Sequence, residues 1–351
     1  MDKTLDIAEF DYHLPDDLIA QEPEEKRDAA RLMWLDRSTG ACSHYRVSDV
    51  VDLLGSGDLL VVNDTRVVPA RLYGRRNPTG GAVECLLLSR IDERHWEALV
   101  HPGQKLKVGA RVDFETAGHR LQMEVVGRHY HGRRTVALST DDGDVESCIE
   151  AIGHVPLPPY IKRSDSTVDR ERYQTVYARS RGSVAAPTAG LHFTQELLDR
   201  LRDRGVSCHA ITLHVGYGTF EPVRTRDITK HRVASEEYEV PFETADAVNR
   251  ALDAGRRIVA VGTTTTRTLE AVAAENGGRL IPGRGRTDLY IYSDFKFKVI
   301  NGLITNFHLP RSSLLLLVAA FAGRENVLRA YGTAVAQRYR FYSYGDAMFV
   351  I

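Results

Sequence analysis

Residues 173–194 read YQTVYARSRGSVAAPTAGLHFT, and the predicted fold is organised around this stretch. Its first part, the Thr-Val-Tyr segment at 175–177, has high strand propensity. Large side chains then become rare over residues 182–190. Small residues let a backbone approach a ligand or another backbone closely, and glycines permit positive φ. We therefore expect a strand followed by a small-residue loop.

The same stretch ends in a histidine and a predicted helix. Thr194 is the expected N-cap, because a helical pattern begins at Gln195 directly after His192. A strand, a small-residue loop, a histidine and a helix N-terminus in this order predict a ligand-binding cradle, which includes Thr188 and Gly190. The alternative is a tight crossover that packs under another element.

Composition is typical of a soluble globular protein with room for two domains, since 351 residues include 43% hydrophobic and 26% charged residues. A net charge of −1 argues against a histone-like nucleic-acid binder, although a local basic face remains compatible with it. Four widely spaced cysteines without a CxxC pair indicate reduced thiols in a cytosolic protein and no zinc site or disulfide framework: Cys42, Cys85, Cys148 and Cys208.

No membrane or export segment is expected. The N-terminal residues MDKTLDIAEFDYHLP lack the apolar region of a signal peptide. The longest apolar run, Leu314–Ala322, is too short to span a bilayer and lies between Pro310 and Gly323, which predicts a buried helix. We therefore expect a cytoplasmic protein that makes no membrane contact.

The central part of the chain predicts a small β domain. From Arg71 to Thr140 helical periodicity is nearly absent, and turn signals such as Asn77-Pro78 and Pro102-Gly103 separate the strand-like runs. The predicted strands are Val83–Leu88, Trp96–Val100, Arg111–Phe114, Leu121–Val126 and Thr135–Leu138. A helix of Val145–Ile152 leads out of this segment. We expect an inserted antiparallel β-barrel or sandwich over residues 70–152.

Residues 1–69 and 153–351 predict one large α/β domain around this insertion. In the first part, Arg31–Asp36 is an expected strand, Ser48 an expected cap of a short helix, and Asp58–Val62 a strand buried on both faces. In the second part, helices are expected near 195–204, 244–254, 265–275, 312–322 and 325–338, and strands near 207–213, 258–261, 288–292, 303–307 and 346–350.

Three further loops follow predicted strands and carry polar groups. His214 lies beside Gly216 and Gly218, a threonine-rich turn begins at Gly262, and His308 follows Asn306. Ligands of α/β sheets lie at the carboxyl ends of strands, and a helix N-terminus favours an anion such as a carboxylate. For each loop the alternative is structural: a helix cap or a hydrogen-bonding histidine.

Motifs for other cofactors are missing from the sequence. There is no HExxH metal signature, no GxxxxGK[ST] loop, and the Gly216-Tyr-Gly218 segment lacks the third glycine of a dinucleotide fingerprint. Basic residues recur around the opening stretch and together favour a surface that follows nucleic-acid phosphates, although each one alone is compatible with a solvated face. The residues expected to bind nucleic acid are Lys162, Arg163, Arg172, Tyr173 and Arg179, with tyrosine rings available to stack on bases.

Several long blocks resemble the S-adenosylmethionine:tRNA ribosyltransferase-isomerases of queuosine biosynthesis. The similar blocks include Phe10–Pro15, Asp58–Leu72, Gly153–Ile161, Tyr173–Thr194, Thr212–Arg224, Ala260–Glu270, Thr305–Pro310 and Tyr339–Asp346, in the family's order. The resemblance implies a large α/β domain with an inserted β-barrel. It also implies transfer and isomerisation of the ribosyl group of S-adenosylmethionine onto 7-aminomethyl-7-deazaguanine at the tRNA wobble position, which gives epoxyqueuosine, adenine and methionine.

This chain departs from the family pattern at one motif. The family usually has His-x-Met-His-x-Glu where this chain has His231-Arg-Val-Ala-Ser-Glu236, so that Ala234 replaces the second histidine. An essential role for that position is therefore doubtful.

The implied reaction needs a base, a donor for the departing adenine and a carboxylate near the amine, but no metal or redox cofactor. We expect His192, His214 or His308 as the base, with a rate that falls below the ordinary imidazole pKa of roughly 6.5, and Asp288 or Glu270 near the amine. Arg267 and the turn after Gly262 are assigned to the methionine carboxylate. The other expected substrate-binding residues are Asn63, Arg66, Thr188, Gly190, Gly216, Gly218, Thr219, Thr263, Thr264 and Asn306.

The expected partners are tRNA and S-adenosylmethionine, and the expected state is a monomer. Two other function classes remain open. A non-catalytic RNA-binding protein should be strongly basic, which a net charge of −1 does not support. A metal-free nucleoside hydrolase can use the same histidine and carboxylate loops, but it should release adenine without tRNA.

Overall fold

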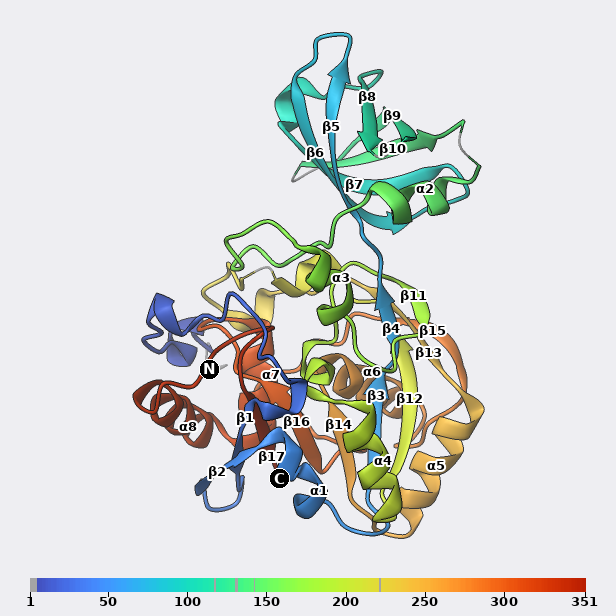
Figure 1. Cartoon of the computed structure of the whole chain (residues 1–351). Coiled ribbons are helices and arrows are strands. Elements are labelled where there is room, and N and C mark those ends of the chain that lie inside the picture. The colour runs from blue at the N-terminus through green and yellow to red at the C-terminus, as the bar shows by residue number, and fades with distance from the viewer. Residues whose placement is uncertain (1–4, 117, 130–131, 142, 221) are drawn as a thin grey trace.

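The computed structural model describes residues 5–351 except residues 117, 130–131, 142 and 221. The first four residues of the N-terminal segment considered above lie outside this part of the chain. A small closed β-barrel stands above a large α/β domain (Figure 1). The predicted fold class, α/β with an inserted antiparallel β-barrel, is therefore confirmed.

A nine-stranded mixed sheet forms the centre of the large domain. Its strand order is β15-β13-β12-β3-β14-β16-β17-β1-β2, and the central strands β12, β3, β14 and β16 are parallel. The strands are β1 (Arg31–Leu35), β2 (Cys42–Arg46), β3 (Leu59–Asn63), β12 (Ser207–Leu213), β13 (Glu236–Val240), β14 (Ile258–Val261), β15 (Gly283–Thr287), β16 (Gly302–Asn306) and β17 (Ala347–Val350). Parallel strands end at the same edge of the sheet, so the loops after β12, β14 and β16 meet there.

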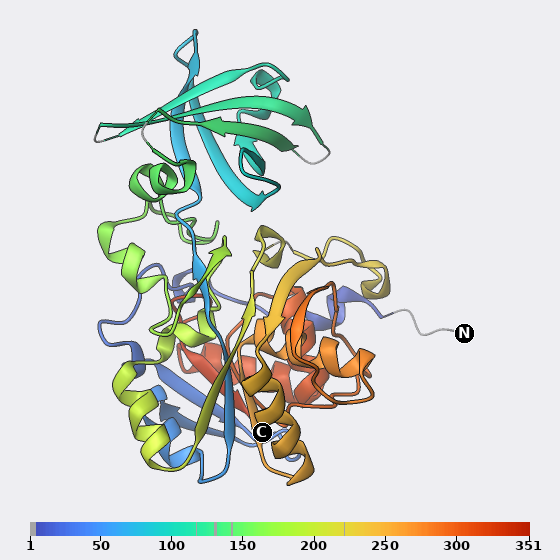
Figure 2. The same cartoon turned by 90° about the vertical axis from the view of Figure 1, so that its right-hand side faces the viewer.

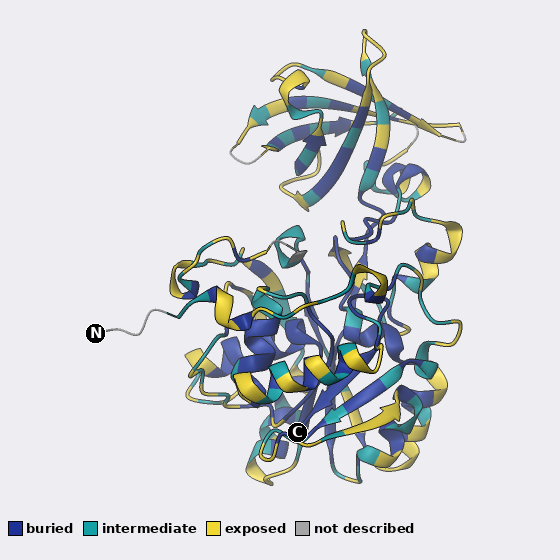
Figure 3. Cartoon of the chain, turned by 90° about the vertical axis from the view of Figure 1, so that its left-hand side faces the viewer, coloured by how far each residue is buried: buried dark blue, intermediate teal, exposed yellow. Residues whose placement is uncertain are grey.

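Helices cover both faces of this sheet, which is why its central strands are continuously apolar. In β3, Leu59 and Val61 belong to the core cluster that also contains residues of α5, α6 and α7, whereas Leu60 and Val62 belong to the cluster that contains residues of α1 and α4. Figure 3 shows the buried strands between helices whose outer faces are exposed. The helices of the large domain are α1 (Val50–Leu53), α3 (Thr167–Arg172), α4 (Gln195–Asp203), α5 (Phe242–Asp253), α6 (Thr263–Glu275), α7 (Ser313–Ala322) and α8 (Arg324–Ala336).

Six antiparallel strands close the barrel in the order β10-β7-β6-β5-β8-β9. Inward and outward residues alternate along β7, so that Trp96, Ala98 and Val100 enter the barrel core. The elements of this part are β5 (Arg71–Asn77), β6 (Ala82–Arg90), β7 (His95–His101), β8 (Arg111–Thr116), β9 (His119–Arg128), β10 (Arg133–Ser139) and α2 (Val145–Ile152).

The chain enters and leaves the barrel at neighbouring points (Figure 2). The backbone N–H of Arg71 donates to the carbonyl of His154 at 3.2 Å, and the N–H of His154 donates to the carbonyl of Arg71 at 2.8 Å. Gly153 permits this approach, because a Cβ at that position would lie 1.9 Å from the carbonyl oxygen of Pro69. We propose residues 70–152 as the inserted domain and residues 1–69 with 153–351 as the large domain.

The expected strand at 175–177 is wrong. Residues 175–177 form a turn, and the strand β11 (Ser180–Ser183) lies five residues later, where it pairs in parallel with β4 (Thr65–Val67). A strand forms only where another strand can hydrogen-bond to it. β4 lies beside Ser180–Ser183, so pairing overrides the local propensity of the Thr-Val-Tyr segment. The cap of the following helix is confirmed, because the Thr194 hydroxyl accepts from the N–H of Leu197 at 3.1 Å.

The expected strand at 288–292 is also wrong. The strand is β15, five residues earlier, and it pairs with β13, which the sequence pattern did not reveal. Cross-strand ion pairs Arg284–Glu239 and Arg286–Glu237 accompany this pairing. Ile291 instead anchors an irregular segment on the core at 2% exposure. Ser48 does not cap α1, which follows a turn of 3-10 helix over Val47–Asp49.

Candidate active site

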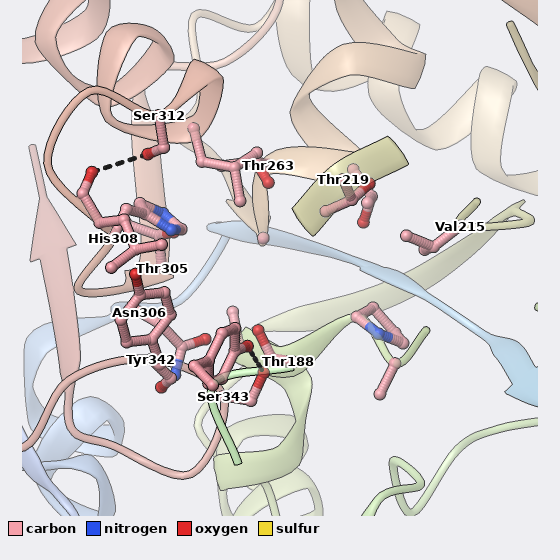
Figure 4. A pocket seen from close by; sticks show the side chains of 18 of the residues that line it. Thr188, Val215, Thr219, Thr263, Thr305, Asn306, His308, Ser312, Tyr342 and Ser343 are labelled. Atoms are coloured by element: carbon pink, nitrogen blue, oxygen red, sulfur yellow. Dashed lines mark hydrogen bonds between the residues drawn. The ribbon is translucent and has the colours of Figure 1, made fainter. Parts of the chain in front are cut away.

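A cavity lies where the loops after β12, β14 and β16 meet (Figure 4). Its walls come from segments that are far apart in sequence: the small-residue loop before α4, the threonine-rich turn, the end of β16 and the loop after α8. Residues with polar side chains on its wall are Tyr160, Thr188, Thr219, Thr263, Thr264, Thr305, Asn306, His308, Ser312, Tyr342 and Ser343. The structure therefore brings Thr188, Thr219, Gly262, Thr263, Thr264, Asn306 and His308 of the predicted site together.

The threonine-rich turn presents a helix N-terminus to this cavity. Gly262 precedes α6 with φ +90°, a conformation that strongly favours glycine. The hydroxyls of Thr265 and Thr266 donate back to the carbonyls of Val261 and Gly262 at 2.8 and 3.1 Å. The first N–H groups of a helix have no partner within the helix, so this end favours an anionic or carbonyl oxygen of a ligand.

Asn63 supports this turn from below. Its amide nitrogen donates to the hydroxyl of Thr264 at 3.2 Å and to the carbonyl of Leu213 at 3.0 Å, and its oxygen accepts from the N–H groups of Thr65 and Leu213. The side chain is 1% exposed and does not line the cavity. Asn63 therefore holds the ends of β3 and β12 and the threonine-rich turn together.

His308 is the one predicted histidine on the wall of the main cavity. Its Nε2 lies 2.8 Å from the Thr305 hydroxyl, and its backbone N–H donates to the Tyr331 hydroxyl at 3.0 Å. Burial lowers the pKa of His308 to about 3. The ring is therefore neutral at physiological pH, so one of its two nitrogens is unprotonated.

His192 lies behind this wall and does not line the main cavity. Its Nε2 lies 3.1 Å from the amide nitrogen of Asn306, and the side chain is 5% exposed. Burial, with Arg27 and Arg340 nearby, lowers the pKa of His192 to about 4.

His214 lies outside the main cavity, although the next residue, Val215, lines it. Its Nδ1 lies 2.9 Å from the hydroxyl of Thr65, which can donate to the carbonyl of Ser180 at 3.3 Å. Gly182 packs on this ring, because a Cβ there would lie 2.9 Å from two ring atoms. Burial lowers the pKa of His214. The three histidines therefore occupy three different environments.

A second cavity of about 440 Å³ adjoins the first, since Thr219 and Leu314 line both. Arg267 lines it with only 8% exposure. Its Nη1 pairs with Glu236 and its Nε donates to the carbonyl of Leu289 at 2.9 Å, whereas Nη2 has no partner among the described residues. Gly218 and Ala234 also line this cavity. The guanidinium is thus fixed with unused donors, which suits a carboxylate.

The two predicted carboxylates have different surroundings. Glu270 is 0% exposed, and its oxygens accept from the N–H groups of residues 298, 299 and 300 at 2.7, 3.0 and 3.0 Å. Burial raises the pKa of Glu270, and these hydrogen bonds counteract the effect. Glu270 therefore holds a buried loop and lines neither of these two cavities. Asp288 is exposed next to Leu289, which lines the second cavity.

Three other predicted substrate-binding residues lie outside the main cavity. Arg66 is exposed on β4, 3.9 Å from Glu150. Gly190 packs against the Tyr177 hydroxyl, from which a Cβ would be only 2.1 Å distant. The N–H of Gly216 donates to Glu236 at 2.7 Å.

The predicted tRNA-binding residues are only partly accessible. Lys162 and Arg179 have side chains that are 74% and 73% exposed. Arg163 makes a bidentate pair with Asp169 at 2.7 and 2.9 Å, and Arg172 donates to the carbonyls of Glu24 and Glu25. Tyr173 is 0% exposed, so stacking of this ring on a base is wrong for this conformation.

Sequence reasoning missed the aromatic wall of the main cavity. The rings of Tyr160 and Tyr342 stack with centroids 4.0 Å apart, and the hydroxyl of Tyr160 lies 2.5 Å from that of Ser343. Both segments belong to blocks that carry the family resemblance, which was the available signal.

The described part of the chain contains no group of three His, Cys, Asp or Glu side chains arranged to hold a metal ion. Within the same part of the chain, Cys42, Cys85, Cys148 and Cys208 form no disulfide. Among the same residues, no helix is long and apolar enough to cross a bilayer.

Known proteins are similar to this chain along almost its whole length. A family model described as queuosine biosynthesis protein matches residues 7–350. An S-adenosylmethionine:tRNA ribosyltransferase-isomerase from Symbiobacterium thermophilum is 52% identical over 98% of this chain and 99% of that protein, and one from Acetivibrio thermocellus has the same values. A crystal structure of S-adenosylmethionine tRNA ribosyltransferase from Thermotoga maritima is 40% identical, covers 98% of this chain and 100% of that one, and gives a TM-score of 0.55. The chain belongs to the family of queuosine biosynthesis proteins.

Proposed function

We propose that this protein transfers and isomerises the ribosyl moiety of S-adenosylmethionine onto 7-aminomethyl-7-deazaguanine at the wobble position of tRNA. The products are epoxyqueuosine in tRNA, adenine and methionine. The observation that carries this proposal is the pair of adjoining cavities at the carboxyl ends of parallel strands, in a chain whose full-length relatives bear this enzyme's name.

The two cavities suit the two ends of S-adenosylmethionine. The larger one has a stacked tyrosine pair and apolar side chains such as Val215 and Leu314, which fit the adenine and ribose. In the smaller one, Nη2 of Arg267 is available for the methionine carboxylate. The N-terminus of α6 lies on the wall of the larger cavity and complements polar oxygens of the same substrate.

His308 is the proposed base, because it is the candidate histidine that lines the main cavity. The sulfonium acidifies the protons on the ribose C5′ atom, and the neutral imidazole removes one of them. Adenine then departs with its bonding electrons from the anomeric carbon and takes a proton. The aminomethyl nitrogen bonds to this carbon and loses a proton, and its lone pair then breaks the bond to the ring oxygen, which leaves an iminium carbon and an alkoxide on C4′. The C5′ ylide carbon bonds to the iminium carbon and closes a five-carbon ring. The C4′ alkoxide then bonds to C5′ to form the epoxide, and methionine leaves as a neutral thioether with the electrons of the carbon–sulfur bond.

Asp288 is the proposed carboxylate for the incoming amine, because it is exposed beside the second cavity, whereas Glu270 is occupied by three backbone donors. Lys162 and Arg179 are the proposed phosphate contacts, since their side chains extend into solvent. We further propose a cytoplasmic monomer that works without a metal ion.

Product analysis tests the function directly. The purified protein is incubated with S-adenosylmethionine and tRNA that carries 7-aminomethyl-7-deazaguanine. Adenine and methionine should appear in equal amounts, one of each per modified tRNA. Adenine release without the tRNA would identify a nucleoside hydrolase, and absence of product with both substrates would refute the proposal.

A further inference from the structure

Asn306 presents an unpaired acceptor at the wall of the main cavity. Its amide nitrogen donates to the backbone carbonyl of Tyr342 at 3.0 Å. A carbonyl only accepts, so the orientation of the amide is determined and the second N–H points to Nε2 of His192 at 3.1 Å. The side-chain oxygen has no hydrogen-bond partner among the described residues, although Asn306 is 2% exposed. Buried acceptors are nearly always paired, so this oxygen indicates a ligand donor.

His192 can hold Asn306 in this orientation only as a neutral ring. Its Nε2 accepts the Asn306 N–H, which places the ring proton on Nδ1. The imidazole is 5% exposed and does not reach the main cavity. His192 is therefore a positioning residue.

Tyr342 has an unusual backbone beside this acceptor. Its φ of 72° lies in the left-handed region, which is unfavourable for a residue other than glycine. Its carbonyl accepts from Asn306 and from the N–H of Gly345 at 2.9 Å, and its ring stacks on Tyr160. The Tyr342 hydroxyl also lacks a partner among the described residues, and the side chain lines the same cavity (Figure 4). This backbone conformation thus places the Tyr342 ring on the wall of the main cavity and the Tyr342 carbonyl next to the Asn306 amide.

We propose that the Asn306 oxygen and the Tyr342 hydroxyl together recognise the edge of a purine base, the oxygen accepting from an exocyclic or ring N–H and the hydroxyl donating to a neighbouring ring nitrogen or carbonyl. The adenine of S-adenosylmethionine is the favoured source of this edge. The deazaguanine of tRNA also has an N–H donor next to an acceptor on one edge of the base. This inference rests on the proposed function and identifies the base subsite within it.

The test compares S-adenosylhomocysteine with its purine analogue, which lacks the 6-amino group. Isothermal titration calorimetry with the wild-type protein should give about 10- to 100-fold tighter binding of the adenine compound, since the analogue leaves the buried oxygen unpaired. Asn306→Ala should lose this discrimination. Tyr342→Phe, which removes only the hydroxyl, should weaken the adenine compound about 5- to 10-fold, while Tyr45→Phe on the surface should change nothing.

The role of His192 is tested through the same discrimination ratio. His192→Gln keeps an acceptor for the Asn306 N–H and should retain discrimination, whereas His192→Leu should lose it. Nitrogen-15 NMR of the wild-type ring should find the proton on Nδ1. A purely structural role would weaken both compounds equally and leave the ratio unchanged.

A second arm distinguishes the two sources of the base. If the wild type binds both compounds equally, but Asn306→Ala raises the KM for the acceptor tRNA by about 10-fold or more, the deazaguanine occupies this subsite. If neither the discrimination nor this KM depends on Asn306 and Tyr342, the proposal is overturned. Formation of epoxyqueuosine by the wild type in the same preparations shows that only the subsite assignment, and not the proposed function, has failed.

Discussion

Two buried imidazoles should make the stability of this protein depend on pH. His192 and His308 have pKa values lowered to about 4 and about 3 by burial, against about 6.5 in an unfolded chain. Below about pH 6.5 the unfolded chain binds protons at these two rings, whereas the folded chain does not. The free energy of unfolding is therefore highest near neutral pH and decreases as the pH is lowered. By linkage, each ring should lower the free energy of unfolding by about 2 kcal/mol when the pH is reduced from about 7.5 to about 5, and both rings together by about 4 kcal/mol.

Urea denaturation at both pH values measures this loss. His192→Gln and His308→Gln should each lose about 2 kcal/mol less than the wild type between the two pH values, because each removes one titrating ring. His119→Gln is the matched control, since His119 is exposed on the barrel and should leave the pH dependence unchanged. If His308→Gln retained the full pH dependence of the wild type, the interpretation of His308 as a buried neutral ring would be refuted.

Four further predictions follow from the same contacts. Glu270→Ala should lower the free energy of unfolding by about 3–5 kcal/mol, because three buried N–H groups lose their acceptor. The kcat of the folded variant should stay near that of the wild type, and a large loss of kcat without destabilisation would instead identify Glu270 as catalytic. Arg267→Met should weaken S-adenosylmethionine binding about 10- to 100-fold by calorimetry, and unchanged binding would exclude a carboxylate contact. Lys162→Ala should reduce the salt slope of tRNA binding by about 1 and spare S-adenosylmethionine affinity. The rate should not fall near pH 6.5 if His308, with its lowered pKa, is the base, so a midpoint there in the pH profile of kcat would favour another group.

Periodicity predicted the parts of the fold in which local sequence and packing agree. The predicted α2 and β12 match the observed elements at both ends, because amphipathic and apolar patterns directly encode which face is buried. Prediction failed where pairing decides the structure. The strand β15 reads Gly-Arg-Gly-Arg-Thr and has little intrinsic strand tendency, but β13 provides backbone partners and opposite charges.

The sequence predicted which loops form the candidate site, but it did not predict the role of each residue in them. The strand-turn patterns correctly indicated that the loops around Gly262 and His308 converge, because parallel strands end at one edge. Burial then separates the histidines, and no sequence pattern reports that His192 lies behind Asn306 while His308 faces the cavity. Glu270 illustrates the same limit, since its three backbone partners lie 28 to 30 residues away in sequence.

β17 (Ala347–Val350) forms the seam of the large sheet, because it pairs in parallel with β1 and antiparallel with β16. Among the described strands, β1 and β2 belong to this sheet only through β17, although β1 begins at Arg31, so the seam joins residues that are far apart in sequence. Contacts between distant residues form slowly, because closing a long loop costs conformational entropy before the contact stabilises the fold. We therefore expect this seam to form after the local strand pairs of the barrel.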